Sequence, residues 1–337
     1  MVANNRLFYA VFAVGFSKLG LNTFTAAHGV QSVGITTKFN LLQLYEIGQI
    51  SLYEQPENIP DVEVTMEKIL DGYPLLYHLA TNGATSATLS GRSNVRSTVA
   101  VSYFTDTQDS ASGTPLKQAL MSGVYPSTIG ANFNINGPFT ESVTLVGNNK
   151  AWLSSSFTFT PTFTNTDSPP GSGGVQLKED LIIGNAGNSS RFPTEIPNIS
   201  SSGYNETDTS GFGNAKIQSI RVSCNLGRDQ MFELGSRQPY FRYVNFPTEV
   251  RSDFEVYCQS GDSVQALETS SNNVTNQNIL LVTRTGDRWD LGTFNKLSNV
   301  SETGGNAGQN GGNRSYTFSY VNFNNLTITS PSDPSGL

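Results

Sequence analysis

The chain has 337 residues, of which only 14% are charged, and it contains 20 Phe and 13 Tyr. Together with abundant Gly, Asn, Ser and Thr, this balance is typical of β-sheet proteins and argues against a mainly helical fold. The formal charge of −7 and the lack of long Lys or Arg runs argue against tight, non-specific binding of nucleic acids.

The first apolar segment spans residues 7–16 and follows a single Arg. No convincing small-residue cleavage site comes after it, and ten residues are too few to cross a bilayer. We therefore expect a buried strand here rather than the apolar part of a signal peptide. Nothing else in the sequence predicts contact with a membrane.

A stretch at residues 31–72 returns as a diverged copy at residues 218–261. The copies align without a gap through three marked pairs: Glu46 with Glu233, Gly48 with Gly235, and Pro60 with Pro247. Such self-similarity indicates one β-rich unit used twice. We expect both segments to adopt the same motif.

Residue types at the matched positions suggest their roles. We interpret the repeated Glu as a structural hydrogen-bond or inter-subunit group rather than a catalytic acid, and the repeated Gly as a bulge or bend at a sheet edge. Apolar pairs such as Tyr45 with Phe232 and Ile47 with Leu234 predict a matched core face.

The repeat also divides the chain. We expect a first β unit at residues 1–160, a surface connector at residues 161–215, and a second β unit at residues 216–337. The fold class is mainly β, with two repeated sandwich or barrel-like units that each carry at most a short flanking helix.

Individual elements follow from local patterns. Residues 30–39 and 97–104 alternate or cluster as strands do, and residues 131–152 predict a hairpin around the Asn-Gly turn. A helix is expected at residues 114–123, where a Thr can cap, a Pro suits the first position and a Gly can stop it. Residues 315–329 predict a further strand.

No catalytic or metal-binding pattern emerges, and we expect a protein that is not an enzyme and has no cofactor. His28 and His78 lack nearby Cys or clustered carboxylates, so they are interpreted as structural. Cys224 and Cys258 are expected to be free thiols, although a single bridge between them stays open.

An ordered series of segments carries a family likeness: HGVQSVGI, LYEIGQISLYEQPENIPDVEVTMEKILDG, FTESVTLVGNNKAW, GVQLKEDLIIG with RFPTEIPNI, and IQSIRVSCNLGRDQMFELGSRQPYFRYVNFPTEV. In these segments, which cover most of residues 28–330, the chain resembles the major tail-tube proteins of long-tailed bacteriophages. The resemblance implies a structural virion protein, assembled in the host cytoplasm, whose rings stack into a channel for DNA. It leaves open a contractile tail, a non-contractile tail, and a tube-like ring near the baseplate.

The resemblance also implies partners: tape-measure, baseplate and neck proteins, and a sheath where the tail is contractile. If one tube unit supplies a sixth of a ring, a chain with two units closes a ring with three copies. DNA would pass without specific binding, so the lining should be acidic or neutral. The candidate lining acids are Glu54, Asp61, Glu63, Glu249 and Asp253.

Two alternatives belong to other functional classes. A secreted or surface adhesin would fit the seven Asn-x-Ser/Thr triplets, although a chain rich in these residues contains many by chance. A jelly-roll enzyme would need a clustered carboxylate pair, whereas acids two residues apart on a strand, such as Asp61 and Glu63, more often mark a solvated face. The triplets begin at Asn188, Asn198, Asn205, Asn273, Asn299, Asn313 and Asn325.

Overall fold

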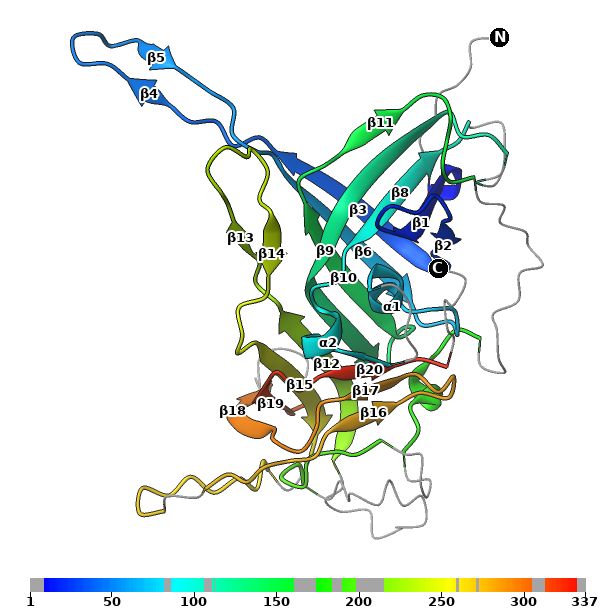
Figure 1. The fold of residues 1–337 in the computed structure, drawn as a ribbon. Coiled ribbons are helices and arrows are strands. Elements are labelled where there is room, and N and C mark those ends of the chain that lie inside the picture. Colours follow the sequence, from blue (N-terminus) through cyan, green and yellow to red (C-terminus); the bar gives the residue numbers. More distant parts are fainter. Residues whose placement is uncertain are drawn as a thin grey trace.

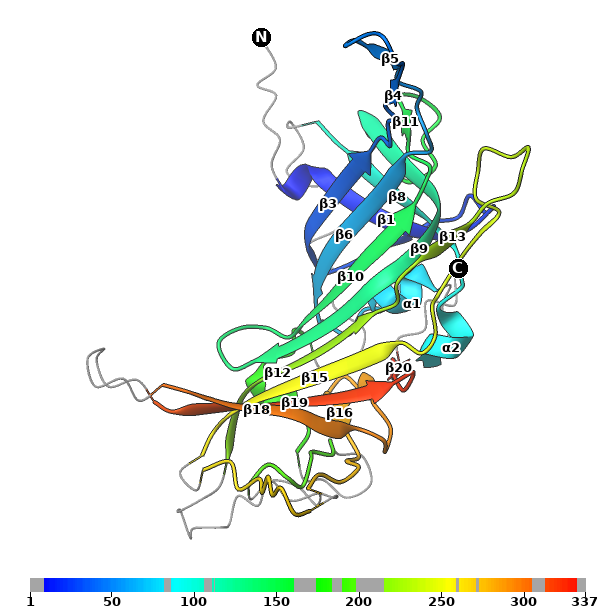
Figure 2. The same cartoon turned by 90° about the vertical axis from the view of Figure 1, so that its left-hand side faces the viewer.

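The computed structural model describes residues 9–81, 86–105, 111, 113–160, 174–183, 190–197, 215–258, 261–270, 273–304 and 313–331. As the composition predicts, the protein is mainly β. Its main sheet follows one path of antiparallel strands, in the order β3-β6-β10-β9-β12-β15-β19-β18 (Figure 2). These strands are β3 (Val30–Lys38), β6 (Asp61–Ile69), β10 (Thr140–Gly147), β9 (Lys117–Asn134), β12 (Lys216–Asn225), β15 (Glu249–Tyr257), β19 (Ser315–Phe323) and β18 (Lys296–Thr303).

Shorter strands form a second layer. The first half of β9 pairs with β8 (Ser97–Tyr103) and β11 (Ala151–Leu153), and β8 continues to β1 (Phe12–Lys18) and β2 (Thr25–Ala26). A separate sheet has the order β16 (Leu280–Val282), β17 (Arg288–Asp290), β20 (Thr327–Thr329), β7 (Ser86–Thr88). The helices are α1 (Leu76–Ala80), α2 (Leu89–Arg92) and the 3-10 turns Tyr9–Val11 and Lys178–Asp180. Within the described residues, no helix is long and apolar enough to cross a bilayer.

The core lies between these layers, because the main sheet is apolar on one face only. Along β6, Val62, Val64 and Met66 are buried, while the alternate residues are exposed. Strict alternation is the pattern of a strand with one solvated face. Across the layers, the ring of Phe133 on β9 meets that of Trp289 on β17 edge to face, at 5.1 Å between centroids.

The two repeat segments fold alike, which confirms that part of the prediction. Each consists of a strand, a two-stranded hairpin and a returning antiparallel strand (Figure 1): β3, β4 (Leu44–Tyr45), β5 (Leu52–Glu54) and β6 in the first, and β12, β13 (Asp229–Met231), β14 (Phe241–Tyr243) and β15 in the second. The register matches as well, because Val33 pairs with Met66 as Ile220 pairs with Phe254. Both pairs of strands carry a bulge at the same step, at Gln31 and at Gln218.

The repeat extends further than the sequence indicates. Hairpin β9–β10 lies beside β6 as hairpin β18–β19 lies beside β15. Ile129 pairs with Val143 as Val300 pairs with Phe318, and one step later each hairpin carries a bulge, at Ser127 and at Ser298. The main sheet is therefore two four-stranded units in tandem, joined where β9 pairs with β12.

The prediction of a helix at residues 114–123 is wrong, because the long strand β9 begins at Lys117. Local capping residues favour a helix, but β9 pairs with β8 along its first half and with β10 and β12 along its second. These ladder hydrogen bonds outweigh the weak preference of a short helix. Pro126 is tolerated inside the strand because it lies at the bulge of the β9–β10 pair.

The connector at residues 161–215 does not run only over the surface, which corrects that expectation for residues 174–183 and 190–197. Gln176, Phe192 and Ile196 are all buried. The backbone of Gln176 bonds to Leu70 and Phe139, so this segment adds to the edge of the first unit. In addition, β7 from the first half pairs with β20 of the second, and the two units share one core.

Two buried ionisable side chains, Lys68 on β6 and Glu141 on β10, bond to the segments around the end of β6 and the start of α1. The Lys68 ammonium donates to Asp71 at 2.5 Å and to the carbonyl oxygen of His28 at 2.8 Å. The Glu141 carboxylate accepts from the backbone N–H groups of Leu76 and Tyr77, at 2.6 and 3.0 Å. It thereby satisfies the first donors of a helix that has no side-chain cap of its own.

Burial raises the pKa of Glu141 to about 7 from its ordinary 4.5, although the two backbone N–H groups and the charge of Lys68 oppose the rise. Because the folded state holds this proton more tightly, the group's stabilising contribution is full below about pH 4.5 and is lost as the pH rises through 7. Over this pH range the free energy of unfolding should fall by an amount on the order of 3 kcal/mol.

We expect Glu141→Gln to remove this part of the pH dependence, since the amide keeps an acceptor but does not titrate. Urea unfolding at several pH values between 4.5 and 8 measures it. Glu63→Gln, at an exposed position on the neighbouring strand, is the matched control and should keep the wild-type slope. An unchanged slope in Glu141→Gln would assign the dependence to another group.

Candidate functional site

One face of the main sheet is open to solvent and polar. It is built from the alternate residues of the strands that do not enter the core, and these are mostly short polar side chains, glycines and acids. Examples, one or two for each central strand, are Glu63 and Thr65, Ser142, Thr128, Arg221 and Glu249. We name this surface the open face.

The expected lining acids occupy different environments. Glu63 and Glu249 are exposed on the open face. Asp253 lies on the same face but is held by Arg251 at 3.0 Å and by the hydroxyl of Ser319 at 2.5 Å. Glu54 lies away from the face, on the exposed strand β5. The structure therefore brings three of the five candidates onto one surface and sets one apart.

The fifth candidate, Asp61, has a structural environment. It accepts hydrogen bonds from Asn40 at 2.9 Å and Gln230 at 3.2 Å, and it forms an ion pair with Arg242 at 2.8 Å. Burial alone would raise the pKa of Asp61, but the hydrogen bonds from Asn40 and Arg242 and the Arg242 charge lower it below the ordinary value. Asp61 thus ties the base of one hairpin to the other. Sequence reasoning missed this, because Arg242 is remote in the chain.

Two hairpins project from the same end of the sheet (Figure 1). We name residues 39–60, which contain β4 and β5, the first arm, and residues 226–247, which contain β13 and β14, the second arm. Both leave the sheet at one end because β3 and β12 run in the same direction in the antiparallel order. The second arm reaches the base of the first through Arg242 and Asp61, and the Arg237 guanidinium donates to the carbonyl oxygen of Glu57 at 3.4 Å.

The tips of the arms are apolar and exposed, which corrects the expectation of a matched core face there. Ile47 is 104% exposed and Leu234, its counterpart, is 105% exposed. Tyr45 and Phe232 are also exposed at matched positions. Both copies of the repeat thus keep large apolar groups where a single chain gains nothing from them. Such groups mark an interaction surface.

The marked repeat positions lie in these arms. Gly48 and Gly235 adopt φ values of +106° and +88° at the tips, with open space around them, so glycine is needed for the turn. They lie at hairpin tips and not at a sheet edge, contrary to expectation. Glu46 accepts a hydrogen bond from Gln49 at 2.8 Å.

The other repeated positions end the arms. Pro60 and Pro247 close the first and second arm before β6 and β15 begin, and the carbonyl oxygen of Pro60 accepts from Asn148 at 2.8 Å. Glu233, the counterpart of Glu46, is exposed, and its carbonyl oxygen accepts from the N–H of Ser236 at 3.4 Å.

Residues that could do chemistry are dispersed. In the described part of the chain, no three or more His, Cys, Asp or Glu side chains are grouped to hold a metal. His28 stacks on Tyr73 at 4.1 Å between centroids, and His78 is fully buried in α1. Cys224 is buried in β12, and neither it nor Cys258 is in a disulfide.

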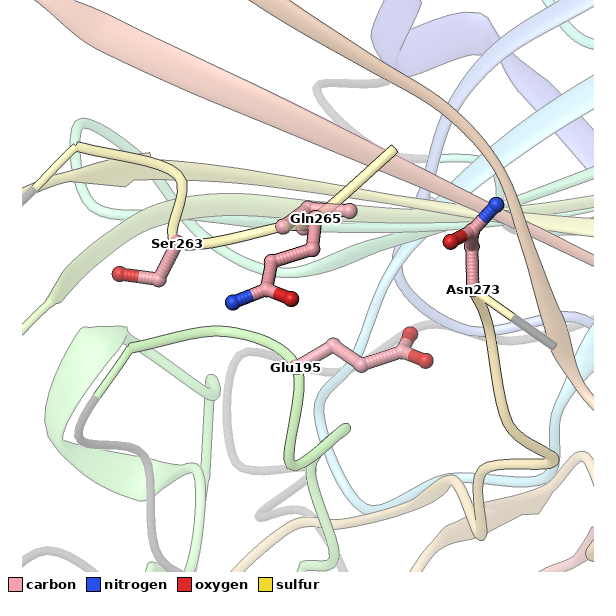
Figure 3. Close-up of a pocket in the computed structure, with 5 residues that line it drawn as sticks. Glu195, Ser263, Gln265 and Asn273 are labelled. Atoms are coloured by element: carbon pink, nitrogen blue, oxygen red, sulfur yellow. The ribbon is translucent and has the colours of Figure 1, made fainter. Parts of the chain in front are cut away.

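A small hollow of about 270 Å³ is lined by Glu195, Ser263, Gln265 and Asn273 (Figure 3). The Glu195 carboxylate accepts from the N–H of Thr275 at 3.0 Å, and the Asn273 amide bonds to the backbone of its own loop. These side chains hold loops together, and Asn273, which begins one of the glycosylation triplets, has its amide engaged.

Comparison with known proteins gives no family: no protein family and no curated protein matches the sequence. Among solved structures, the chain is similar to one in "Cryo-EM structure of the anti-feeding prophage (AFP) baseplate, 6-fold symmetrised". The identity is 11%, the TM-score is 0.34, and the match covers 45% of this chain and 98% of that chain. A similarity at this level carries no argument about function.

We expect Asp61→Ala to loosen the second arm, because Arg242, whose side chain is 6% exposed, would lose its carboxylate. Solvent screening at the partly exposed Asp61 keeps the cost low, at roughly 1–2 kcal/mol. Urea unfolding measures the cost, and trypsin cleavage after the exposed Arg237 should become faster. Glu63→Ala, an open-face acid, should change stability by less than about 0.5 kcal/mol. Equal effects of the two substitutions would remove the distinction drawn between these acids.

Proposed function

We propose that this chain is a structural virion protein that forms the tube of a phage-like tail, as three-copy rings stacked into a channel for DNA. The observation that carries the proposal is the tandem repeat of a four-stranded unit in one sheet with a covered face and a polar open face. If a sheet of this kind continued around a ring with its open face inward, it would enclose a lumen lined by that face. The resemblance of the sequence to tail-tube proteins supports the same assignment.

The open face suits a passage for DNA. Its strands offer Ser, Thr, Asn and Gly, with Glu63 and Glu249 exposed among them. Acids repel phosphates, whereas a lining rich in Lys or Arg would bind them and retard transit. The face also carries basic residues, among them Lys38, Arg221 and Arg251. Arg251 is paired with Asp253 at 3.0 Å. The surface is thus fitted to let DNA pass without holding it.

The arms suit contact between rings. Each chain would place two equivalent arms on one side of the ring, so that a ring of three chains presents six apolar tips. Burying Ile47 and Leu234 against the next ring would stabilise the contact between rings by about 1.5–3 kcal/mol per side chain. The occupant of this surface is therefore a second ring of the same chain. Tape-measure, baseplate and neck proteins, and a sheath in a contractile tail, would meet the tube elsewhere.

The first test is assembly. Purified protein should form tubes with an axial channel in electron micrographs, and mass measurement of isolated rings should give three chains. Ile47→Asp with Leu234→Asp should leave rings of the same mass that do not stack, because charged tips cannot be buried without a partner. The matched control, Glu46→Gln with Glu233→Gln, alters adjacent tip positions and should still stack. Six chains per ring, or monomers alone, would overturn the proposal.

The second test concerns the lining. Glu63→Lys with Glu249→Lys should slow DNA release from particles assembled with the variant, and added salt should reduce the difference because it screens phosphate contacts. Glu179→Lys with Glu268→Lys makes the same change in net charge at exposed positions outside the main sheet. This control should release DNA at the wild-type rate. If both variants behave like the wild type at every salt concentration, the open face does not line the channel.

A further inference from the structure

The main sheet has two unpartnered edges. Among the described strands, β3 pairs only with β6, and β18 pairs only with β19. Each edge strand presents a row of backbone N–H and C=O groups without a neighbouring strand. Such edges are templates for pairing with another chain.

The repeat makes each free edge equivalent to a strand that is already paired. β3 corresponds to β12, with matched register and a matched bulge. β18 corresponds to β9, again with matched register and a matched bulge. β12 and β9 pair with each other inside the chain, with Cys224 opposite Ile129 and Ser223 opposite Gly130. The molecule therefore contains one complete example of the junction that its two free edges could make.

We propose that β3 of one copy pairs antiparallel with β18 of the next copy, in the register of the internal β12–β9 pair. Transferring that register through the two equivalences places Thr37 opposite Val300 of the next copy, and Thr36 opposite Ser301. The partner is a second copy of this chain, and the contact is head to tail. This junction rests on the proposed ring assembly, for which it names the contacting strands.

The edge strands β3 and β18 are less buried than their counterparts β12 and β9, as expected of strands that lack a neighbour on one side. Val222 and Cys224 on β12 are buried, while their counterparts Ile35 and Thr37 on β3 are only partly buried. Ile129 on β9 is buried, while its counterpart Val300 on β18 is partly buried. Ile35 and Val300 already pack against the core, and a strand added at either edge would cover them further, with Thr37 opposite Val300 and Glu302 opposite Ile35.

The bulges limit the register in one direction. On β18 the regular strand begins after the bulge at Ser298, and on β3 it begins after the bulge at Gln31. In the proposed register the Ser298 bulge falls beyond Lys38, the last residue of β3, and the regular segments face each other. A two-residue slip in one direction would place the bulge against regular strand, where the ladder is disrupted.

One departure from the internal junction adds charge complementarity. Glu302 stands where β9 has Ala131, and it is bonded to Arg314 in its own chain at 2.5 Å. In the proposed register Glu302 of the next copy lies one diagonal step from Thr37. The Lys150 ammonium donates to the Thr37 hydroxyl at 2.5 Å. Diagonal neighbours are within reach of long side chains, so an acid and a base would meet there.

Disulfide trapping tests the register in the assembled protein. In a Cys258→Ser background, Thr36→Cys with Ser301→Cys should cross-link neighbouring copies under mild oxidation, because directly opposite residues have Cα atoms within disulfide range. Non-reducing gels should show two and three linked chains. Thr36→Cys with Thr303→Cys, shifted by one diagonal step, should cross-link at least tenfold less. Asn225→Cys with Thr128→Cys, opposite each other inside the chain, should close within one chain.

Two single variants guard against misfolding of the double variant. Thr36→Cys mixed with Ser301→Cys before assembly should give dimers, and neither should do so alone. Tubes or rings without cross-linking of Thr36 to Ser301, or with equal cross-linking of the shifted pair, would overturn this junction and leave the proposed function standing. Monomers alone, with no cross-link, would overturn both.

Discussion

The structure depends on the pairing of β9 with β12. This ladder runs without a bulge from Ser219 opposite Asn134 to Asn225 opposite Thr128, and it fuses two four-stranded units into one sheet. Without it, each unit would keep two free edges and only half of the common core. β9 can serve both layers because it is long: its first half belongs to the β8 side and its second half to the main sheet. The connector residues that pack at Gln176 and the strand β7 complete the fusion.

A sheet built in this way must leave one face to solvent. The buried face already has the second layer, the short helices and the shared core against it. The other face carries alternate polar residues that would each need a partner if they were covered. Polar side chains at those positions keep the face open, and such a face is compatible with a lumen. The fold and the proposed channel therefore follow from the same alternation.

Sequence reasoning recovered what is local or repeated. Alternation predicted β3 and β8, and the Asn136-Gly137 turn predicted the β9–β10 hairpin. It failed where distant residues decide. The predicted helix at residues 114–123 is instead largely part of strand β9, because neighbouring strands pair with β9 on both sides.

The functional surfaces show the same limit. Glu63 and Glu249 were predictable as solvated acids, because they alternate with apolar residues. The Arg242 partner of Asp61 and the free edges β3 and β18 were not, because both depend on topology. The apolar tips at Ile47 and Leu234 were visible as matched apolar pairs. Periodicity alone could not tell whether such a pair is buried or exposed, because the residues at both positions are apolar whether they form a core or a contact surface.

Duplication within one chain has a physical consequence for the edges. The two strands of the internal junction belong to one chain, so β9 and β12 meet at a high effective concentration. Backbone hydrogen bonds and small or apolar side chains such as Ala131 and Ile129 are then enough to hold them together. The free edges must find each other in solution and must also avoid pairing wrongly. Each edge strand has a bulge, and in addition Lys38 lies at the end of β3 and Glu302 near the end of β18. Bulges and charges on edge strands discourage indiscriminate pairing and still permit the register in which they do not collide.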